Sequence, residues 1–256
     1  MSINPAYMTA TLVKGLDVLE ALSDVEEIGL SDLARKQGVS SPTLFRILAT
    51  LGARGYVHKS PAGRYRLTLK AWEIGAKAVR RLALRDIARP FMERLAADTQ
   101  ETVNLSVMQG DGIVIIDKID SPHAVRAETF VGLRAPIHCS ATGKAIIAYE
   151  PPEALDALLP ERLQRHTEAT ITDRAELARE LAQVRRQGWA RNREEWRPGV
   201  CAAGVPVRDA AGAVVASLSV TVPTSRFSNE ILRDRMVPAL KKAAAGLEQQ
   251  IARTAR

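Results

Sequence analysis

Residues 30–67 read LSDLARKQGVSSPTLFRILATLGARGYVHKSPAGRYRL, and this stretch decides the fold of the first part of the chain. A helix of about two turns is predicted with Ser31 as its N-cap, ending at Gly38, a residue type suited to a left-handed C-cap. After a short turn, Thr43–Arg54 has its apolar residues at helical spacing: Leu44, Ile47, Leu48 and Leu51. The pattern predicts two helices joined by a tight turn.

A basic hairpin follows the second helix. Tyr56–Lys59 and Arg64–Leu67 are strand-like runs separated by a Ser60–Gly63 turn. Upstream, Leu12–Leu22 is predicted to be a helix with one apolar face turned inward, formed by Leu12, Leu16, Leu19 and Leu22. This order of elements predicts a winged helix-turn-helix, whose second helix can enter a DNA major groove. Small helical domains without a DNA role also contain such turns, so that alternative stays open.

The charge distribution favours a nucleic-acid partner for the same region. Residues 1–82 contain 12 Lys or Arg against 7 Asp or Glu, whereas residues 83–256 contain 24 against 22. A basic module joined to a nearly neutral one suits a DNA reader attached to a sensor, although a generally basic protein would look similar. Aromatic residues make up only 4%, which argues against stacking platforms for single strands.

Several classes of protein are excluded by composition. With 256 residues, 46% of them hydrophobic, the chain is large enough for one or two globular domains. Cys139 and Cys201 are the only cysteines, too few for a disulfide framework or a Cys-rich zinc site. No apolar run approaches the roughly 20 residues that cross a bilayer, and no signal-peptide pattern opens the chain, so we expect a cytoplasmic protein without a membrane partner.

The remainder of the chain predicts a mixed α+β domain that encloses a small-molecule pocket. We expect a winged helix-turn-helix over residues 1–68, a helical linker over 69–84 and the larger domain over 85–256. The larger domain is predicted to contain strands at Thr102–Met108, Ile113–Ile119, Val125–Val131, Pro136–Ser140, Val205–Val207 and Ala213–Val222. Helices are predicted at Asp86–Thr99, from Gly143 to Tyr149, at Pro152–Leu159, from Thr172 or Asp173 to Gln187, and at Asn229–Ala252.

Several separated motifs resemble the isocitrate lyase regulator (IclR) family of bacterial transcription factors. The first domain matches at LSDLA (30–34), at TLFRILATL (43–51) and at GRYRL (63–67). The larger domain matches at VGLRAPIH (131–138), ATGKA (141–145), REE (193–195) and PGV (198–200). The resemblance runs from Val13 to about Val222. It implies a winged-helix DNA-binding domain, a GAF-like effector domain, and a homodimer or dimer of dimers on a palindromic operator.

The resemblance also implies particular pocket residues. An acidic residue, a cysteine and two hydroxyl side chains line the ligand site in family members, and these positions fall on Asn192, Ala202, Ser219 and Thr221. Because Ala replaces the cysteine, and Cys201 would point to the opposite face of a strand, one usual effector contact is missing. The sequence also departs from the family at Ser41, often a basic residue, and at Pro42, often Ser, so the operator sequence does not transfer.

The DNA contacts are predicted to come from the second helix and the wing. Arg46 and Thr43 share a helix face from which Arg46 can reach a guanine edge or a phosphate. Hydroxyl groups and backbone N–H groups at the start of the helix suit a phosphate, and the wing adds basic side chains. The predicted DNA-binding residues are Ser40, Ser41, Pro42, Thr43, Arg46, Lys59 and Arg64, each of which also has a purely structural interpretation as a cap or a solvated charge.

The effector is predicted to be a small organic acid, with aromatic acids among the candidates. Its pocket is predicted to comprise Ala141, Thr142, Asn192, Ala202, Ser219 and Thr221, with N–H groups at the helix start facing the carboxylate. The segment Ser140–Lys144 has a single glycine and lacks the spacing of a Walker A loop, which argues against nucleotide hydrolysis.

Metal and catalytic chemistry are not predicted. His138 and Cys139 are adjacent, so on a strand their side chains would diverge, and no third ligand is evident from the sequence. No Ser, His and Asp set suggests hydrolysis, and the adjacent Glu194 and Glu195 suit no paired acid–base geometry. We therefore predict a ligand-responsive transcriptional regulator without a cofactor. The alternatives are an enzyme, or a sensory module acting on a small carboxylate, with a helix-turn-helix that is only structural.

Overall fold

The computed structural model describes residues 8–80 and 84–254, which belong to two compact units, Met1–Arg81 and Leu82–Arg256. The predicted linker, 69–84, contains helix α4 (Lys70–Arg80), which groups with the first unit, whereas Leu84 already begins α5. Residues 1–7 of the predicted first domain and 81–83 of the predicted linker lie outside the described residues.

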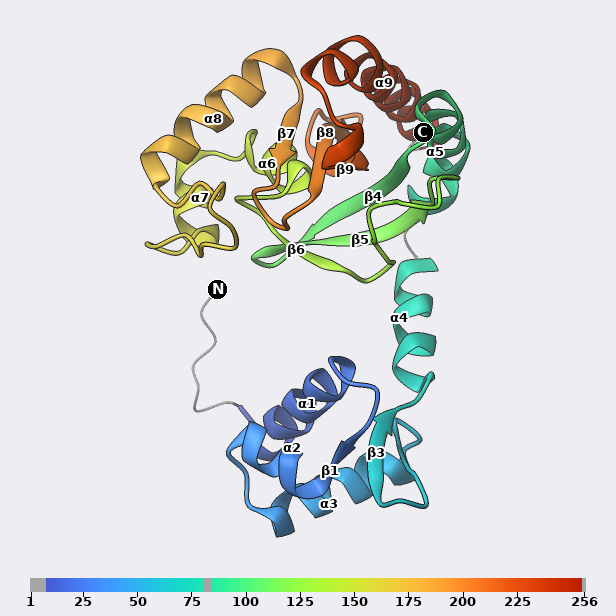
Figure 1. The fold of residues 1–256 in the computed structure, drawn as a ribbon, viewed down its shortest axis with the longest axis vertical. Helices are drawn as coiled ribbons and strands as arrows, with labels where there is room; N and C mark the ends of the chain where they lie inside the picture. Colours follow the sequence, from blue (N-terminus) through green and yellow to red (C-terminus); the bar gives the residue numbers. More distant parts are fainter. Residues whose placement is uncertain (1–7, 81–83, 255–256) are drawn as a thin grey trace. The chain divides into compact units, whose positions relative to one another are not determined.

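The first unit is a winged helix-turn-helix, as predicted (Figure 1). Its helices are α1 (Ala10–Ser23), α2 (Leu30–Gln37) and α3 (Ser41–Ala53). An antiparallel sheet in the order β1-β3-β2 joins β1 (Ile28–Gly29), β2 (Val57–Lys59) and β3 (Arg64–Leu67). The three helices and the wing share one apolar core, which includes Val18, Leu22, Leu33, Leu44, Leu48 and Tyr65.

Three local predictions in this unit need correction. The N-cap of α2 is Gly29, so Ser31 lies inside the first turn. The two-residue strand β1 was not predicted, because so short a run has no periodicity. Of the predicted inward face of α1, Leu22 is buried and Leu19 packs against the core, but Leu12 and Leu16 are 63% and 51% exposed, because only the C-terminal part of the helix is buried. Gly38 ends α2 in the left-handed region, at φ 61°, as predicted.

The second unit is built around a six-stranded antiparallel sheet in the order β6-β5-β4-β9-β8-β7. Its strands are β4 (Thr102–Gln109), β5 (Gly112–Ile119), β6 (Arg134–Pro136), β7 (Ala190–Arg193), β8 (Val200–Arg208) and β9 (Val214–Pro223). Helices α5 (Leu84–Thr99) and α9 (Val237–Thr254) lie side by side against the sheet (Figure 1). The other helices are α6 (Ala141–Ile147), α7 (Pro152–Leu158) and α8 (Arg174–Gln187), and the short helical turns are η2 (Thr224–Arg226) and η3 (Ile231–Met236).

Helix α6 packs directly against β8 because Gly204 permits close approach, and Gly143 lets the turn before α6 lie against the helix. A Cβ atom on Gly204 of β8 would lie 2.9 Å from the carbonyl oxygen of Ala141. A Cβ atom on Gly143 would collide with the backbone of Ile137. The Ser140 hydroxyl caps the helix by accepting a hydrogen bond from the N–H of Gly143 at 3.1 Å. The start of α6 is therefore held against the face of the sheet that carries Gly204.

Two strand predictions in this unit are wrong. Residues 125–131 form no strand, and side chains bind their carbonyl groups in place of a neighbouring strand: Lys118 donates to Thr129 O at 2.6 Å and Arg226 to Val125 O at 2.8 Å. The predicted strand Pro136–Ser140 is displaced to Arg134–Pro136, and residues 137–139 form a turn. Among the helices of the described residues, none is long and apolar enough to cross a lipid bilayer.

Candidate functional site

Helix α3 presents a polar face away from the core of the first unit. Leu44, Ile47 and Leu48 are buried, while Ser41, Pro42, Phe45 and Arg46 are exposed. Ser40 precedes the helix in an extended conformation, and its hydroxyl lies 2.9 Å from the Thr43 hydroxyl. The predicted residues of this helix therefore share one accessible region around its first turn.

One exposed side chain on this face was not among the predicted DNA contacts. Phe45 is 50% exposed, next to Arg46. An aromatic ring on an exposed helix face suits apolar contact with a thymine methyl group. The signal was present in the sequence, because Phe45 falls outside the buried spacing of Leu44, Ile47 and Leu48.

The two predicted wing residues have different surroundings. Arg64 donates a hydrogen bond to the carbonyl oxygen of Glu27 at 2.8 Å and lies 3.8 Å from its carboxylate. The Lys59 ammonium lies 5.6 Å from the centre of the Tyr65 ring and is exposed. Lys59 is thus the more available of the two for a phosphate, since Arg64 also holds β3 against the β1 segment.

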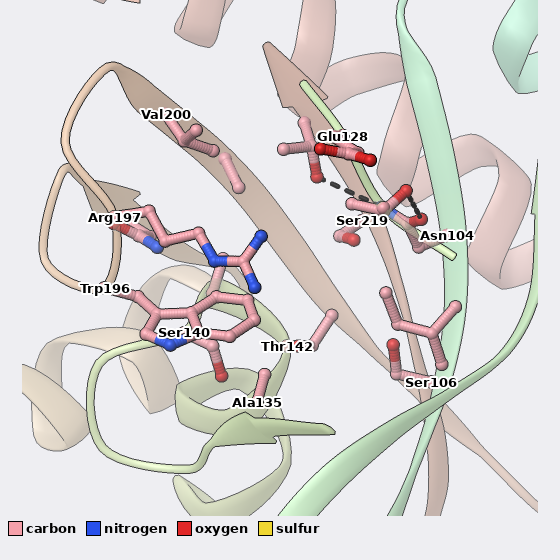
Figure 2. Close-up of a pocket in the computed structure, with 16 residues that line it drawn as sticks. Asn104, Ser106, Glu128, Ala135, Ser140, Thr142, Trp196, Arg197, Val200 and Ser219 are labelled. Atoms are coloured by element: carbon pink, nitrogen blue, oxygen red, sulfur yellow. Dashed lines mark hydrogen bonds between the residues drawn. The ribbon is translucent and has the colours of Figure 1, made fainter. Parts of the chain in front are cut away.

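A small cavity of about 50 Å³ lies between the sheet and the start of α6 in the second unit (Figure 2). Polar side chains from several strands converge on it with a few apolar ones. All six predicted effector residues are among its lining: Ala141, Thr142, Asn192, Ala202, Ser219 and Thr221. The structure brings these six together, although their binding of an effector stays a prediction.

Strand register explains this convergence. Asn192 of β7 pairs with Ala202 of β8, which pairs with Thr221 of β9. Two residues away along β9, Ser219 pairs with Asn104 of β4. Because alternate residues of a strand point to the same face, these side chains form a continuous polar surface beneath α6. Cys201 is absent from the lining, and its sulfur lies 3.7 Å from the Thr224 hydroxyl, as expected for the opposite face.

Some of the polar lining groups are already engaged. The amide of Asn104 donates to the Thr221 hydroxyl at 3.1 Å and accepts from the Thr129 hydroxyl at 2.8 Å. The side-chain oxygen of Asn192 accepts the N–H of Glu195 at 2.9 Å. These bonds hold the pocket wall in place.

One lining hydroxyl stands apart from this network. In the part of the chain that the structure describes, the buried hydroxyl of Ser106 has no hydrogen-bond partner. A buried polar group without a partner carries a free-energy cost, which a ligand that bonds to it would relieve. The Ser106 hydroxyl is therefore a candidate ligand contact that was not predicted from the sequence.

Charged and aromatic groups complete the lining and were also missed. Figure 2 shows the Arg197 guanidinium extending toward the middle of the pocket, with Asn104, Glu128 and Ser219 on the far side. The guanidinium carbon of Arg197 lies 4.4 Å from the centre of the Trp196 ring, within cation–π range. The REE and PGV motifs bracket both residues, and that proximity was the signal that could have identified them.

A buried ion pair ties α6 to the loop that carries Arg197. The Lys144 ammonium is fully buried and lies 2.7 Å from each carboxylate oxygen of Glu195 and 3.3 Å from Glu180. Burial raises the pKa of Glu195 above its ordinary value, against the opposing attraction of Lys144. Lys144, in the ATGKA motif, therefore links α6 to the segment that carries Arg197 and fixes the position of that pocket wall.

Comparisons with known proteins agree with this architecture. Residues 11–61 match the family model described as the IclR helix-turn-helix domain, and residues 76–249 match the one described as bacterial transcriptional regulator IclR C-terminal. The HTH-type transcriptional regulator KdgR of Escherichia coli (strain K12) is 36% identical over 244 residues, 94% of this chain and 92% of the relative.

Solved structures give the same result. An IclR transcriptional regulator from Alicyclobacillus acidocaldarius aligns with a TM-score of 0.81 and 29% identity, covering 96% of this chain and 100% of that one. An IclR homologue from Microbacterium hydrocarbonoxydans, complexed with 4-hydroxybenzoate, aligns with a TM-score of 0.79 and 27% identity, covering 94% and 99%.

Proposed function

The chain belongs to the IclR family of bacterial transcriptional regulators, and from that premise we propose that a small organic acid bound in the second unit modulates its binding to operator DNA. The observation that supports this most strongly is the cavity beneath α6, where the Arg197 guanidinium faces hydroxyl and amide groups. A ligand with different affinity for two arrangements of the protein shifts the population between them, and hence the DNA occupancy.

DNA binding is assigned to α3 and the wing. The exposed face around Arg46 enters the major groove, with Phe45 against a thymine methyl group and Lys59 on the adjacent backbone. Ser40, Ser41 and Thr43 meet a phosphate at the start of the helix. Arg64 contributes less to DNA binding directly, because its guanidinium is already hydrogen-bonded to the carbonyl oxygen of Glu27.

The chemistry of the pocket favours a small carboxylate that also carries hydrogen-bonding groups. Arg197 supplies the positive charge, while Ser106 and Ser219 offer hydroxyl groups on the sheet side. Ile115, Ala135 and Val200 provide apolar contact. The 4-hydroxybenzoate of the Microbacterium homologue has this combination of a carboxylate, an apolar ring and a hydroxyl group.

We further propose that two copies pair through the first unit. The exposed Leu12 and Leu16 of α1 lie along a groove of about 830 Å³ that is also lined by Ile74 of α4. Thr43 and Arg46 of α3 line the same groove, so we assign only its α1 and α4 residues to the pairing surface and leave Arg46 to the DNA. Trp72 of α4 is 68% exposed. Apolar side chains gathered around one groove are typical of an interaction surface, and a two-fold pair would match a palindromic operator.

DNA binding is tested by fluorescence anisotropy with the intergenic DNA beside the protein's own gene, at two salt concentrations. We expect Arg46→Ala to weaken specific binding by about 1–3 kcal/mol, roughly 5- to 150-fold, because a base contact is lost. Arg191→Ala removes the same charge from an exposed position of the second unit and should change little. Equal affinities for wild type and Arg46→Ala would contradict the assignment of α3.

Effector binding is tested by calorimetry with a panel of small carboxylates. Ser219→Ala combined with Thr221→Val, and separately Arg197→Gln, should weaken binding of the acid that alters DNA affinity. The exposed Arg193→Gln in β7 is the matched control. Wild-type affinity in Arg197→Gln would remove that residue from the site. Chemical turnover of a bound acid, without any effect on DNA affinity, would favour the enzyme alternative.

A further inference from the structure

Three side chains of the types that can ligate a metal lie close together next to the start of α6. One ring nitrogen each from His138 and His166 and the sulfur of Cys139 lie within 4.8 Å of one another. The two imidazole rings are 5.8 Å apart between centroids. His138 and Cys139 are buried, and His166 is half-buried.

His138 and Cys139 were predicted to lie on a strand, where adjacent side chains diverge. They lie instead in the turn between β6 and α6, where this constraint does not apply. The third ligand, His166, comes from a loop 27 positions further along the chain. Thr167 and Thr170 hold that loop by donating hydrogen bonds to the carbonyl oxygens of Glu194 and Glu195, each at 2.6 Å.

The hydrogen bonds of the two histidines leave nitrogen lone pairs available. Nε2 of His138 lies 3.0 Å from the carbonyl oxygen of Gln164, so this nitrogen carries the proton and Nδ1 is the free acceptor. A backbone carbonyl on the second nitrogen is the usual support of a metal-binding histidine. Within the described residues, the buried Nε2 of His166 has no hydrogen-bond partner. A cation would satisfy this otherwise unexplained atom.

We propose that His138, Cys139 and His166 bind a zinc ion. Imidazole nitrogen and thiolate sulfur are the ligands zinc prefers, at about 2.0–2.1 Å and 2.3 Å. Tetrahedral coordination at those lengths sets the ligand atoms about 3.3–3.6 Å apart. The three ligand atoms, which lie within 4.8 Å of one another, must therefore move closer together when the ion binds. Three protein ligands leave the fourth position for a water molecule or another small donor.

The positive charge of the neighbouring Lys144 is offset by its two carboxylate partners. The neighbouring Lys144 ammonium is paired with two carboxylates, Glu195 and Glu180, so this group of three side chains is net negative. The ion would also connect two parts of the pocket wall. His138 and Cys139 directly precede the start of α6, while the loop of His166 is bonded to the backbone just before Trp196 and Arg197. Zinc occupancy should therefore stiffen both walls and raise the affinity for the effector.

The proposal is tested on the full-length protein after treatment with a chelator. Zinc is added in competition with a chromophoric indicator, and bound metal is counted by mass spectrometry after gel filtration. We expect one zinc per chain. His166→Ala should weaken binding at least tenfold, since loss of even a supporting contact costs 10- to 100-fold. His123→Ala, which removes an exposed histidine outside the group, is the matched control.

Cobalt substitution gives a second readout that identifies the sulfur ligand. A cobalt complex of the wild type should show the near-ultraviolet charge-transfer band of a thiolate ligand, and Cys139→Ser should lose it. Near-ultraviolet circular dichroism of each metal-free variant checks that it is folded. The proposal is overturned if folded wild type binds no stoichiometric zinc, if His123→Ala loses as much affinity as His166→Ala, or if the cobalt band survives in Cys139→Ser. None of these outcomes bears on DNA binding, which the Arg46 experiment tests separately.

Discussion

Replacing Lys144 with Met should destabilise the second unit strongly. The ammonium of Lys144 is fully buried and contacts both oxygens of Glu195, whose own side chain is only 9% exposed. The substitution preserves most of the volume but leaves the Glu195 carboxylate buried without its counter-ion. Breaking a buried pair in this way typically costs about 3–5 kcal/mol, and we expect a loss in this range at pH 7.5.

The pH dependence of this loss has a defined sign. Burial already raises the pKa of Glu195 with Lys144 present, and without the lysine an opposing attraction disappears. The folded variant then binds a proton on Glu195 more tightly than the unfolded chain does. Its free energy of unfolding should therefore rise, relative to wild type, as the pH falls from 7.5 toward 5, because protonation removes the uncompensated charge.

The assay is urea unfolding of the second unit, followed by circular dichroism at several pH values. The double variant Lys144→Met with Glu195→Gln is the decisive control, since it removes the buried Glu195 carboxylate and leaves only the more exposed Glu180 without its partner. It should be more stable at pH 7.5 than Lys144→Met alone, with a coupling energy of about 0.5–3 kcal/mol. The reasoning would be refuted if the unfolding free energy of Lys144→Met were less than about 1 kcal/mol below that of wild type, or if this difference did not change with pH.

Two further predictions concern the framework around the pocket. Gly143→Ala should lower the free energy of unfolding by about 1–3 kcal/mol, because the new Cβ collides with the backbone of Ile137. The control is Gly75→Ala in α4, where a Cβ meets nothing within 4 Å, so no loss of stability is expected. Thermal unfolding of both variants checks this, and equal melting temperatures would contradict it. Arg226→Lys should destabilise the second unit by about 1–2 kcal/mol, since lysine cannot reproduce the two hydrogen bonds of 2.6 and 2.8 Å that Arg226 donates to Glu101. Urea titration measures this loss, and an unchanged midpoint would show that these bonds contribute little to stability.

Local signals account for the parts of the fold that the sequence predicted well. The winged helix depends on contiguous features: apolar residues at helical spacing in α3, a glycine in the left-handed region at Gly38, and two short runs flanking the Ser60–Gly63 turn. Each feature specifies its own segment with little help from distant residues. The same holds for α8, where Asp173 accepts the N–H of Glu176 and Gly188 ends the helix.

The predictions failed where a segment depends on its neighbours. Residues 125–131 have strand-like composition, yet the bonds from Lys118 and Arg226 hold them as a loop. Leu12 and Leu16 have the spacing of a core face, but the first unit covers only the C-terminal part of α1 and leaves these two side chains exposed. Composition alone cannot distinguish such an apolar stripe from a buried one.

The sequence by itself determined the fold class, the helix-turn-helix and six residues that line one pocket, four of them through the family resemblance. Only the tertiary structure decided that Ser106 and Arg197 face the same cavity, and that His166 meets His138 and Cys139. The physical reason is that strand alternation and helix spacing act over a few residues. The meeting of groups 27 or more positions apart depends on sheet register and on loops held by specific hydrogen bonds, which local periodicity does not encode.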